Sequence, residues 1–338
     1  MRANGFSEKG CAMDVSGEGE GRICRCIAED AYAQEMRRVV EPYVNEGCSS
    51  GIMDGLYYEF YENDEPKGTI VISFGFTESC EKYHELICYM LREGYQAAVM
   101  AHRGHGKSMR ECGDPELVHV EDFSQYVKDL HRFVQKIVLP RRKGAPLLLY
   151  AHSMGGCIGT LYLESYPGIF ERAVLSAPMY GINNGKIPDF AAGLLCGAAI
   201  LFGKKKERLF TAGGFDPDEP FESAGCDSRA RHDYYLGLRR AHREYQTSGA
   251  TYGWALAALR AGKRAISPAN AAKIQIPVLL FQATDDAFVR AAEQELFLSR
   301  VAGSRKVTVK SRHEINRLPG KRLERYLAEI FAFYGEAL

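Results

Sequence analysis

Short, continuous apolar runs recur along the chain, and each is bounded by glycine, proline or charged residues. Strands that are buried on both faces have this pattern, whereas half-buried strands alternate apolar and polar residues. The runs are Thr69–Phe74, Ala97–Met100, Leu147–Tyr150, Ala173–Leu175, Val278–Phe281 and Val307–Val309. We therefore expect six strands, each buried on both faces.

Between these runs the apolar residues recur with a helical period. Residues 83–91, 120–137 and 323–334 carry apolar side chains at spacings of three and four. Strands that alternate with helices predict an α/β fold with a mostly parallel, doubly wound sheet. The alternation stops over residues 179–273, which we interpret as a helical cap inserted between two core segments, 28–178 and 274–338.

The N-terminal part of the chain follows other patterns. Residues 1–27 show little apolar periodicity, so we expect a flexible tail. A short helix suits residues 28–44. The turn residues Asp54 and Gly55 within 51–61 predict an antiparallel hairpin that enters the sheet at its edge.

The amino-acid composition argues against several classes of function. The 43 Lys and Arg residues balance the 43 Asp and Glu residues, so no net charge favours a nucleic acid partner. No apolar run approaches the ~18 residues of a spanning helix, and the first residues lack the apolar centre of a secretory signal, so we expect a cytoplasmic protein. The ten cysteines are scattered, which favours reduced thiols and predicts no metal site.

The most informative stretch is 147–156, where a predicted strand runs into Ala-His-Ser-Met-Gly and then into a helix. This pattern is typical of a nucleophile elbow, which presents a serine on a sharp strand-to-helix turn. The turn needs small residues two positions before and after the serine, and Ala151 and Gly155 occupy them. The pattern predicts Ser153 as a nucleophile.

Five motifs in this order resemble the α/β-hydrolase superfamily, in particular its lysophospholipase and monoacylglycerol-lipase-like branch. They are Phe74–Tyr83, His102–Ser108, Ala151–Gly155, Gln282–Val289 and Ser311–Ile315, within roughly residues 45–335. The sequence departs from the family pattern at Phe74, where many relatives carry histidine, and at Ala151, which replaces a glycine. The resemblance implies an α/β-hydrolase core with a cap, and a serine hydrolase that needs no cofactor.

A serine hydroxyl needs a base to take its proton, and the base needs a carboxylate that holds it in one tautomer. In this fold the chain order is serine, acid, histidine. His313 is the only histidine after every acid candidate, and the adjacent Asp285 and Asp286 follow a predicted strand. The residues alone leave both carboxylates open. The resemblance favours Asp286, because the small apolar residue common in the family follows it at Val289.

Backbone N–H groups are expected to hold the oxyanion of an ester-cleaving serine enzyme. By position in the fold they belong to Met154, next after the serine, and to Phe76 in the loop after the first core strand. The nearby segment His102–Ser108 lacks the spacing of a phosphate-binding loop. We interpret it as a tight turn, in which the resemblance implies that Arg103 and Ser108 bind backbone or neighbouring loops.

The 13-residue apolar run 190–202 would form a helix about 20 Å long, which is too short to cross a bilayer. A buried cap helix and a lid wall that lines an acyl channel both suit this run, and we prefer the channel wall. Transient contact with a membrane surface beside Lys204–Lys206 is the secondary expectation. The residues expected to touch the acyl chain are Leu194, Leu195, Ile200 and Phe202.

The leading hypothesis is a serine ester hydrolase that acts on a lipid monoester, such as a lysophospholipid or a monoacylglycerol. Cap residues rather than the catalytic residues choose the substrate in such folds. A short-chain carboxylesterase and an aminopeptidase-like relative are therefore the alternatives among enzymes. A noncatalytic lipid-binding member is the alternative from another class.

Overall fold

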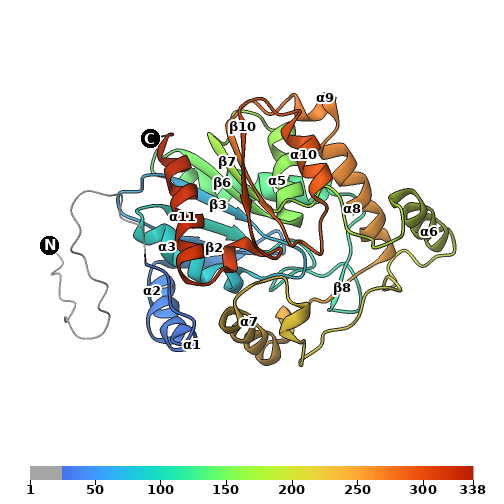
Figure 1. The fold of residues 1–338 in the computed structure, drawn as a ribbon, viewed down its shortest axis with the longest axis horizontal. Coiled ribbons are helices and arrows are strands. Elements are labelled where there is room, and N and C mark those ends of the chain that lie inside the picture. The colour runs from blue at the N-terminus through green and yellow to red at the C-terminus, as the bar shows by residue number, and fades with distance from the viewer. Residues whose placement is uncertain (1–24, 338) are drawn as a thin grey trace.

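The computed structural model describes residues 25–337 and is built around a twisted eight-stranded sheet (Figure 1). The strand order is β1-β2-β4-β3-β6-β7-β9-β10, and only β2 runs antiparallel to its neighbours. The strands are β1 (Cys48–Met53), β2 (Leu56–Tyr61), β3 (Thr69–Ser73), β4 (Gln96–Met100), β6 (Leu147–His152), β7 (Arg172–Ser176), β9 (Val278–Ala283) and β10 (Ser304–Val309). The predicted mostly parallel sheet is confirmed.

The first two strands form the predicted hairpin at one edge of the sheet. Met53 pairs with Leu56, and the turn between them consists of Asp54 and Gly55, both with positive φ values of 51° and 81°. Two consecutive residues of this kind match the twist of antiparallel strands, which is why Asp-Gly is favoured here.

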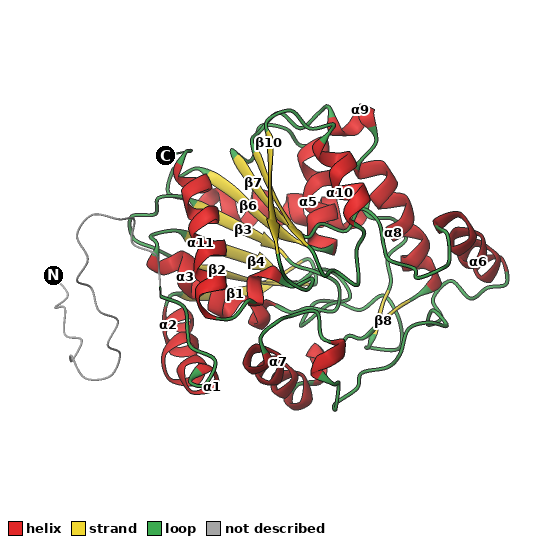
Figure 2. Ribbon diagram, in the orientation of Figure 1, coloured by secondary structure: helices red, strands yellow, loops and turns green. Residues whose placement is uncertain are grey.

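Helices cover both faces of the sheet (Figure 2), and the sheet separates two apolar cores. Along β3, Ile70 and Ile72 belong to one core and Val71 to the other, as the two-residue period of a strand requires. On the first face lie α2 (Glu41–Glu46), α3 (His84–Arg92) and α11 (Gly320–Gly335); on the second lie α4 (Ser124–Phe133), α5 (Met154–Ser165), α8 (Tyr252–Ala265) and α10 (Ala291–Leu298).

Strand β10 differs from the expectation that every strand is buried on both faces. It is the outer strand of the sheet, and Arg305, Lys306 and Thr308 are exposed. Arg305 pairs with Glu336 and Lys306 with Glu295. Charged side chains on an outer strand oppose pairing with other chains, which explains why this edge is not apolar throughout.

Between β7 and β9 the chain is mainly helical, as expected for residues 179–273. It contains α6 (Asp189–Leu201), α7 (Arg229–Ala241), α8 and α9 (Pro268–Ala271), and the two-residue strand β8 (Gly249–Ala250), which pairs with β5 (Leu117–Val118). However, Trp254, Ala258 and Ala261 of α8 lie in the sheet core. Helix α8 therefore belongs to the sheet core, which leaves α6, α7 and their loops as the cap.

The described chain begins inside the segment that was expected to be a tail. Cys26 and Ile27 are buried, and the Ile27 N–H donates a hydrogen bond to the Tyr89 hydroxyl at 3.0 Å. The helix expected over 28–44 consists of α1 (Tyr32–Glu35), a π-helical turn at Met36–Val40 and α2. The rest of the expected tail, residues 1–24, lies outside the described residues. Within 25–337, no helix is long and apolar enough to cross a membrane.

Candidate active site

Ser153 occupies the sharp turn between β6 and α5, as the elbow pattern predicts. Its φ of 52° is rare for a residue with a side chain, and such backbone strain tends to occur at functional sites. Three hydrogen bonds hold the turn: the Ser153 N–H donates to the Ser176 carbonyl at 3.0 Å, and the Ser153 carbonyl accepts from Met179 at 2.9 Å and from Cys157 at 3.2 Å.

Small residues around Ser153 are required by close backbone contacts. Gly155 packs against the end of β3, and a Cβ on Gly156 would lie only 2.7 Å from the Cβ of Pro178. Ala151 is completely buried at the end of β6. The position of the serine is therefore determined by packing on both sides of the elbow.

Ser153, His313 and Asp286 form one chain of hydrogen bonds. The Ser153 Oγ lies 2.8 Å from His313 Nε2, and His313 Nδ1 lies 2.7 Å from Asp286 Oδ2. The His313 and Asp286 side chains are 8% and 7% exposed, so water scarcely competes for these bonds. Each residue follows a different parallel strand, β6, β10 or β9, and these strands end at the same edge of the sheet.

The structure distinguishes the two adjacent carboxylates that the residues alone left open. Asp286 Oδ1 accepts hydrogen bonds from the N–H groups of Phe288 at 2.8 Å and Val289 at 3.0 Å, while Oδ2 faces His313. Burial alone would raise the pKa of Asp286, but His313 and the two N–H groups hold this pKa below its usual value. Asp285 is exposed, and the carboxylate that pairs with His313 is that of Asp286.

The two predicted oxyanion donors flank the serine. Met154 is the first residue of α5, and Phe76 lines the same cavity as Ser153 in the loop after β3. Within residues 25–337, neither N–H donates a hydrogen bond to another protein group. The ring of Phe76 packs on Trp254 with 4.3 Å between ring centroids, and Thr77 next to it has a φ of 61°.

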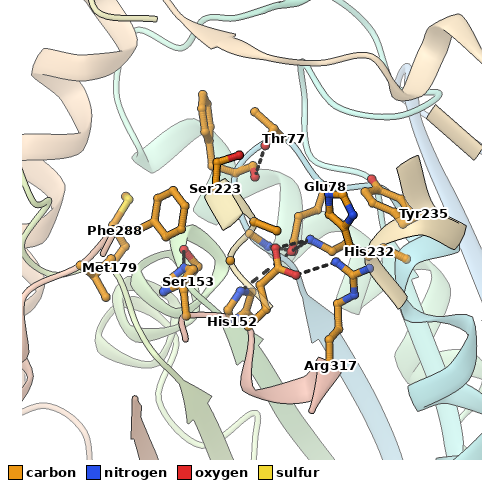
Figure 3. Close-up of a pocket in the computed structure, with 18 of the residues that line it drawn as sticks. Thr77, Glu78, His152, Ser153, Met179, Ser223, His232, Tyr235, Phe288 and Arg317 are labelled. Carbon is orange, nitrogen blue, oxygen red and sulfur yellow. Dashed lines mark hydrogen bonds and ion pairs between the residues drawn. The ribbon is translucent and has the colours of Figure 1, made fainter. Parts of the chain in front are cut away.

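A cavity of about 330 Å³ opens beside Ser153. Its walls differ in chemistry: Figure 3 shows Met179 and Phe288 on the left near Ser153, and Glu78, Tyr235 and Arg317 on the right. Further apolar lining residues are Phe76, Ile182, Trp254 and Val289, and further polar ones are Lys82, Glu219, His232, Arg239 and Glu314.

The polar wall contains a buried network of ion pairs that we did not predict from the sequence. Lys82 Nζ lies 2.6 Å from Glu78 Oε1 and 2.7 Å from Glu314 Oε1, and Arg317 lies 2.6 Å from Glu314 Oε2. Burial opposes ionisation of both glutamates, but Lys82 keeps their pKa values below the usual range. Glu78 also accepts the N–H of Gly75 at 2.6 Å. The network therefore fixes the loop that carries Phe76.

The segment His102–Ser108 is the tight turn that we expected. Arg103 forms two hydrogen bonds with Asp129, at 2.6 and 3.0 Å, and a third with Glu111 at 2.9 Å. Ser108 Oγ donates to the Ala101 carbonyl at 2.6 Å and accepts from the Tyr57 N–H at 2.9 Å. These contacts are structural, and neither Arg103 nor Ser108 borders the cavity beside Ser153.

The prediction that 190–202 lines the acyl site is wrong for this structure. None of Leu194, Leu195, Ile200 and Phe202 borders the cavity beside Ser153. Helix α6 packs on α8, away from the sheet (Figure 1). Leu194, Leu195 and Phe202 are 70%, 50% and 84% exposed, and Leu194 and Ile200 border a separate cavity between α6 and α8. Periodicity could not locate the helix, because α6 is apolar nearly all round.

The structure shows how the possible metal ligands and the cysteines are arranged. Among the described residues, no group of three or more His, Cys, Asp or Glu side chains is arranged to hold a metal ion. The described cysteines at 48, 80, 112, 157, 196 and 226 are free thiols.

The sheet, the elbow and the Ser153–His313–Asp286 chain define an α/β-hydrolase, so the expected fold and superfamily are confirmed. The model of the serine aminopeptidase S33 family of hydrolases matches residues 64–317, and the chain belongs to this family.

Named relatives and a solved structure agree with this assignment. Lysophospholipase L2 of Escherichia coli (strain K12) is 34% identical to this chain over 221 residues. The aligned part is 65% of this chain and 64% of that relative, so the chain spans just under two thirds of the length of the relative. Monoacylglycerol lipase of Mycolicibacterium smegmatis is 27% identical over an alignment that covers 73% of this chain and 80% of the lipase. The structure of a soluble variant of monoglyceride lipase from Saccharomyces cerevisiae superposes with a TM-score of 0.68 at 18% identity, covering 85% of this chain and 94% of that chain.

Proposed function

We propose that this protein is a serine carboxylic-ester hydrolase that acts on lipid monoesters, either lysophospholipids or monoacylglycerols. The observation that carries the proposal is the hydrogen-bond chain from Ser153 through His313 to Asp286, at the mouth of a cavity with one apolar and one polar wall. A serine, a histidine and a carboxylate joined by hydrogen bonds in this order activate the serine for attack on a carbonyl carbon.

In the first half-reaction, Ser153 Oγ attacks the ester carbonyl carbon while its proton passes to His313 Nε2. Asp286 holds the opposite ring nitrogen, Nδ1, and stabilises the imidazolium that forms. The N–H groups of Phe76 and Met154 receive the negative oxygen of the tetrahedral intermediate. His313 then gives the proton to the leaving alcohol, the ester C–O bond breaks, and an acyl-Ser153 remains.

In the second half-reaction, water replaces the alcohol. His313 Nε2 takes a proton from the water as its oxygen attacks the acyl carbon. Collapse of the second tetrahedral intermediate returns the proton to Ser153 Oγ and releases the fatty acid. These steps use only groups of this chain and water.

The two walls of the cavity support a substrate with an apolar acyl chain and a polar alcohol. Met179 and Phe288 would contact the acyl part, since these side chains lie on the side of Ser153 opposite the charged groups (Figure 3), and Val289, next to Phe288 in the chain, lines the same cavity. The polar wall holds three cationic groups (Lys82, Arg239 and Arg317) and three carboxylates (Glu78, Glu219 and Glu314). Such a balance suits a polar headgroup without demanding a net charge. The names of the relatives agree with this class of substrate.

The decisive experiment is a hydrolysis panel with a Ser153→Ala control. The panel contains p-nitrophenyl acetate, a long-chain p-nitrophenyl ester, lysophosphatidylcholine, monoolein and a proline arylamide. We expect turnover of the lipid monoesters that is lost in Ser153→Ala, together with loss of fluorophosphonate labelling. Preference for acetate or for the arylamide would replace the proposal with an esterase or a peptidase. Lipid binding without any turnover would leave a noncatalytic binder.

We also propose that α6 makes the transient membrane contact expected of the cap. Phe190, Leu194, Leu201 and Phe202 are each at least 69% exposed, and Lys204–Lys206 follow directly. A contiguous exposed apolar surface beside lysines favours contact with a lipid surface that carries anionic headgroups. The cytoplasmic location expected from the sequence stays a prediction.

A further inference from the structure

Arg231, in the first turn of α7, is a fully buried cation that binds three parts of the chain. Its guanidinium donates to Glu85 of α3 at 2.8 and 2.5 Å, and to Glu29, before α1, at 2.6 Å. It also lies 4.5 Å from the centroid of the Tyr32 ring. Buried charges are stable only when they are paired, so these contacts determine where the start of α7 lies.

Glu29 is the N-terminal partner in this arrangement. Besides the bond from Arg231, its carboxylate accepts a hydrogen bond from the hydroxyl of Ser228, the N-cap of α7, at 2.6 Å. Figure 1 shows α1 beside α7, and the rings of Tyr32 and Tyr234 make an edge contact at 5.7 Å. The segment before α1 is therefore bound to the cap helix by charge, hydrogen bonds and aromatic packing.

The helix that these residues hold forms part of the cavity wall. His232, Tyr235, Leu236 and Arg239 of α7 all border the cavity beside Ser153. The neighbouring backbone is connected to the site as well, because the Arg231 carbonyl accepts a hydrogen bond from Arg317. Arg317 in turn pairs with Glu314 in the ion-pair network of the polar wall.

We propose that Glu29 and Arg231 are positioning residues, through which the N-terminal segment holds α7 at the headgroup end of the cavity and so determines the affinity for the alcohol part of the substrate. The segment lies outside residues 64–317, which the family model matches, so this role is a property of the chain rather than of the matched region. The kinetic test of this inference rests on the proposed function. The hydrogen–deuterium exchange test does not, because it needs no substrate.

Glu29→Ala is the informative variant, because it leaves the buried cation paired. Arg231 would keep both hydrogen bonds to Glu85. Loss of Glu85 would instead leave a buried cation whose one remaining carboxylate partner, Glu29, is partly exposed to solvent. Asp30→Ala is the matched control, since Asp30 is the exposed neighbour of Glu29 and the substitution removes the same charge. Glu29→Gln keeps one acceptor oxygen for Ser228 and Arg231 and should restore most of the wild-type behaviour.

Two measurements on the full chain test the proposal. In Glu29→Ala we expect KM for lysophosphatidylcholine or monoolein to rise at least fivefold, while kcat/KM for p-nitrophenyl acetate and fluorophosphonate labelling of Ser153 stay within twofold. Hydrogen–deuterium exchange, which needs no substrate, should become at least fivefold faster in α7 (Arg229–Ala241) and remain unchanged in α5. Asp30→Ala should match the wild type in both measurements.

Three outcomes would overturn the inference. The first is exchange in α7 that Glu29→Ala changes no more than Asp30→Ala does. The second is faster exchange in α5 together with equal losses on all esters, which would make Glu29 a residue of general stability. The third is faster exchange in α7 with no change in KM for the lipid esters. If the wild type hydrolyses no ester at all, the proposed function fails, and the exchange result still decides whether Glu29 holds α7.

Discussion

A Cβ atom added to Gly155 would lie 2.0 Å from the carbonyl oxygen of Ser73, at the end of β3. Two residues 82 positions apart are thus in backbone contact, and Ser73 Oγ donates a hydrogen bond to the Gly155 carbonyl at 3.2 Å. The contact joins the nucleophile elbow to the strand that leads into the Phe76 loop. It explains why glycine, and no larger residue, follows Met154.

Gly155→Ala should therefore destabilise the protein by at least ~3 kcal/mol, the upper end of the usual cost of overpacking, because backbone rather than a flexible side chain must move. Gly197→Ala in α6 is the control, since its Cβ would meet nothing within 4 Å. That variant should be stabilised by roughly 0.5–1 kcal/mol, as expected for alanine in a helix. Urea denaturation of both variants checks the prediction, and equal stabilities would contradict it.

The hydrogen bonds of Asp286 predict a large difference between two adjacent substitutions. Asp286→Asn should lower kcat on the order of 10⁴-fold, because an amide cannot stabilise the imidazolium of His313 and favours the wrong tautomer. Asp285→Asn should retain most of the activity. Steady-state kinetics, with circular dichroism to verify folding, test the pair; the reverse ranking would assign the acid to Asp285.

The apolar wall predicts which residues determine acyl preference. Met179→Gln should raise KM for a long-chain p-nitrophenyl ester about fivefold or more and leave KM for the acetate nearly unchanged, since each buried CH₂ contributes ~0.8 kcal/mol. Leu195→Gln in α6 is the matched control and should change neither value. A larger effect at Leu195 than at Met179 would place the acyl chain against α6.

Helix α6 should affect only substrates that are presented in a lipid surface. Leu201 and Phe202 are 88% and 84% exposed, so the double variant Leu201→Gln/Phe202→Gln should fold normally. We expect weaker sedimentation with anionic vesicles and slower hydrolysis of monoolein in those vesicles, with unchanged hydrolysis of p-nitrophenyl acetate. Unchanged vesicle binding would refute the membrane contact.

Glu164 in α5 predicts a pH-dependent stability that is separate from catalysis. Burial raises the pKa of Glu164 to about 8, although Arg264 and Lys273 oppose this shift, and its Oε1 has no hydrogen-bond partner among the described residues. The folded state therefore keeps a proton that the unfolded state loses near pH 4.5. Between these values, stability should fall as pH rises, by up to ~1.4 kcal/mol per pH unit.

Glu164→Gln should remove this dependence. Its stability advantage over the wild type should be small near pH 4.5 and should grow up to about pH 8. Glu171→Gln, at an exposed position, serves as the control for loss of a carboxylate. Thermal unfolding at a series of pH values measures the effect, and parallel curves for the wild type and Glu164→Gln would disprove it.

The parts of this protein that sequence could predict are those with local signals. The elbow was recognisable because Ala151 and Gly155 flank Ser153 between a strand and a helix, and the hairpin because Asp54 and Gly55 suit a tight turn. Motif order led to His313, and resemblance rather than physics favoured Asp286. The predicted strand positions agree with the observed ones because each apolar run is short and clearly bounded.

The parts that could not be predicted depend on contacts between distant segments. Glu78 and Lys82 have a spacing that suggests a helical ion pair, but Glu314, which completes the network, is 232 residues away from Lys82. Glu29 and Arg231 are likewise 202 residues apart. The position of α6 could not be derived because an apolar sequence does not specify which surface covers it.

The 160 residues that separate Ser153 from His313 also have a consequence for synthesis. When the elbow leaves the ribosome, the nucleophile is already present, but its base lies beyond β10, the last strand to join the sheet. Long-range pairing of this kind is the slow part of folding. On the proposed mechanism, a nascent or truncated chain cannot cleave esters, and the onset of hydrolysis marks the moment at which the two ends of the domain have come together.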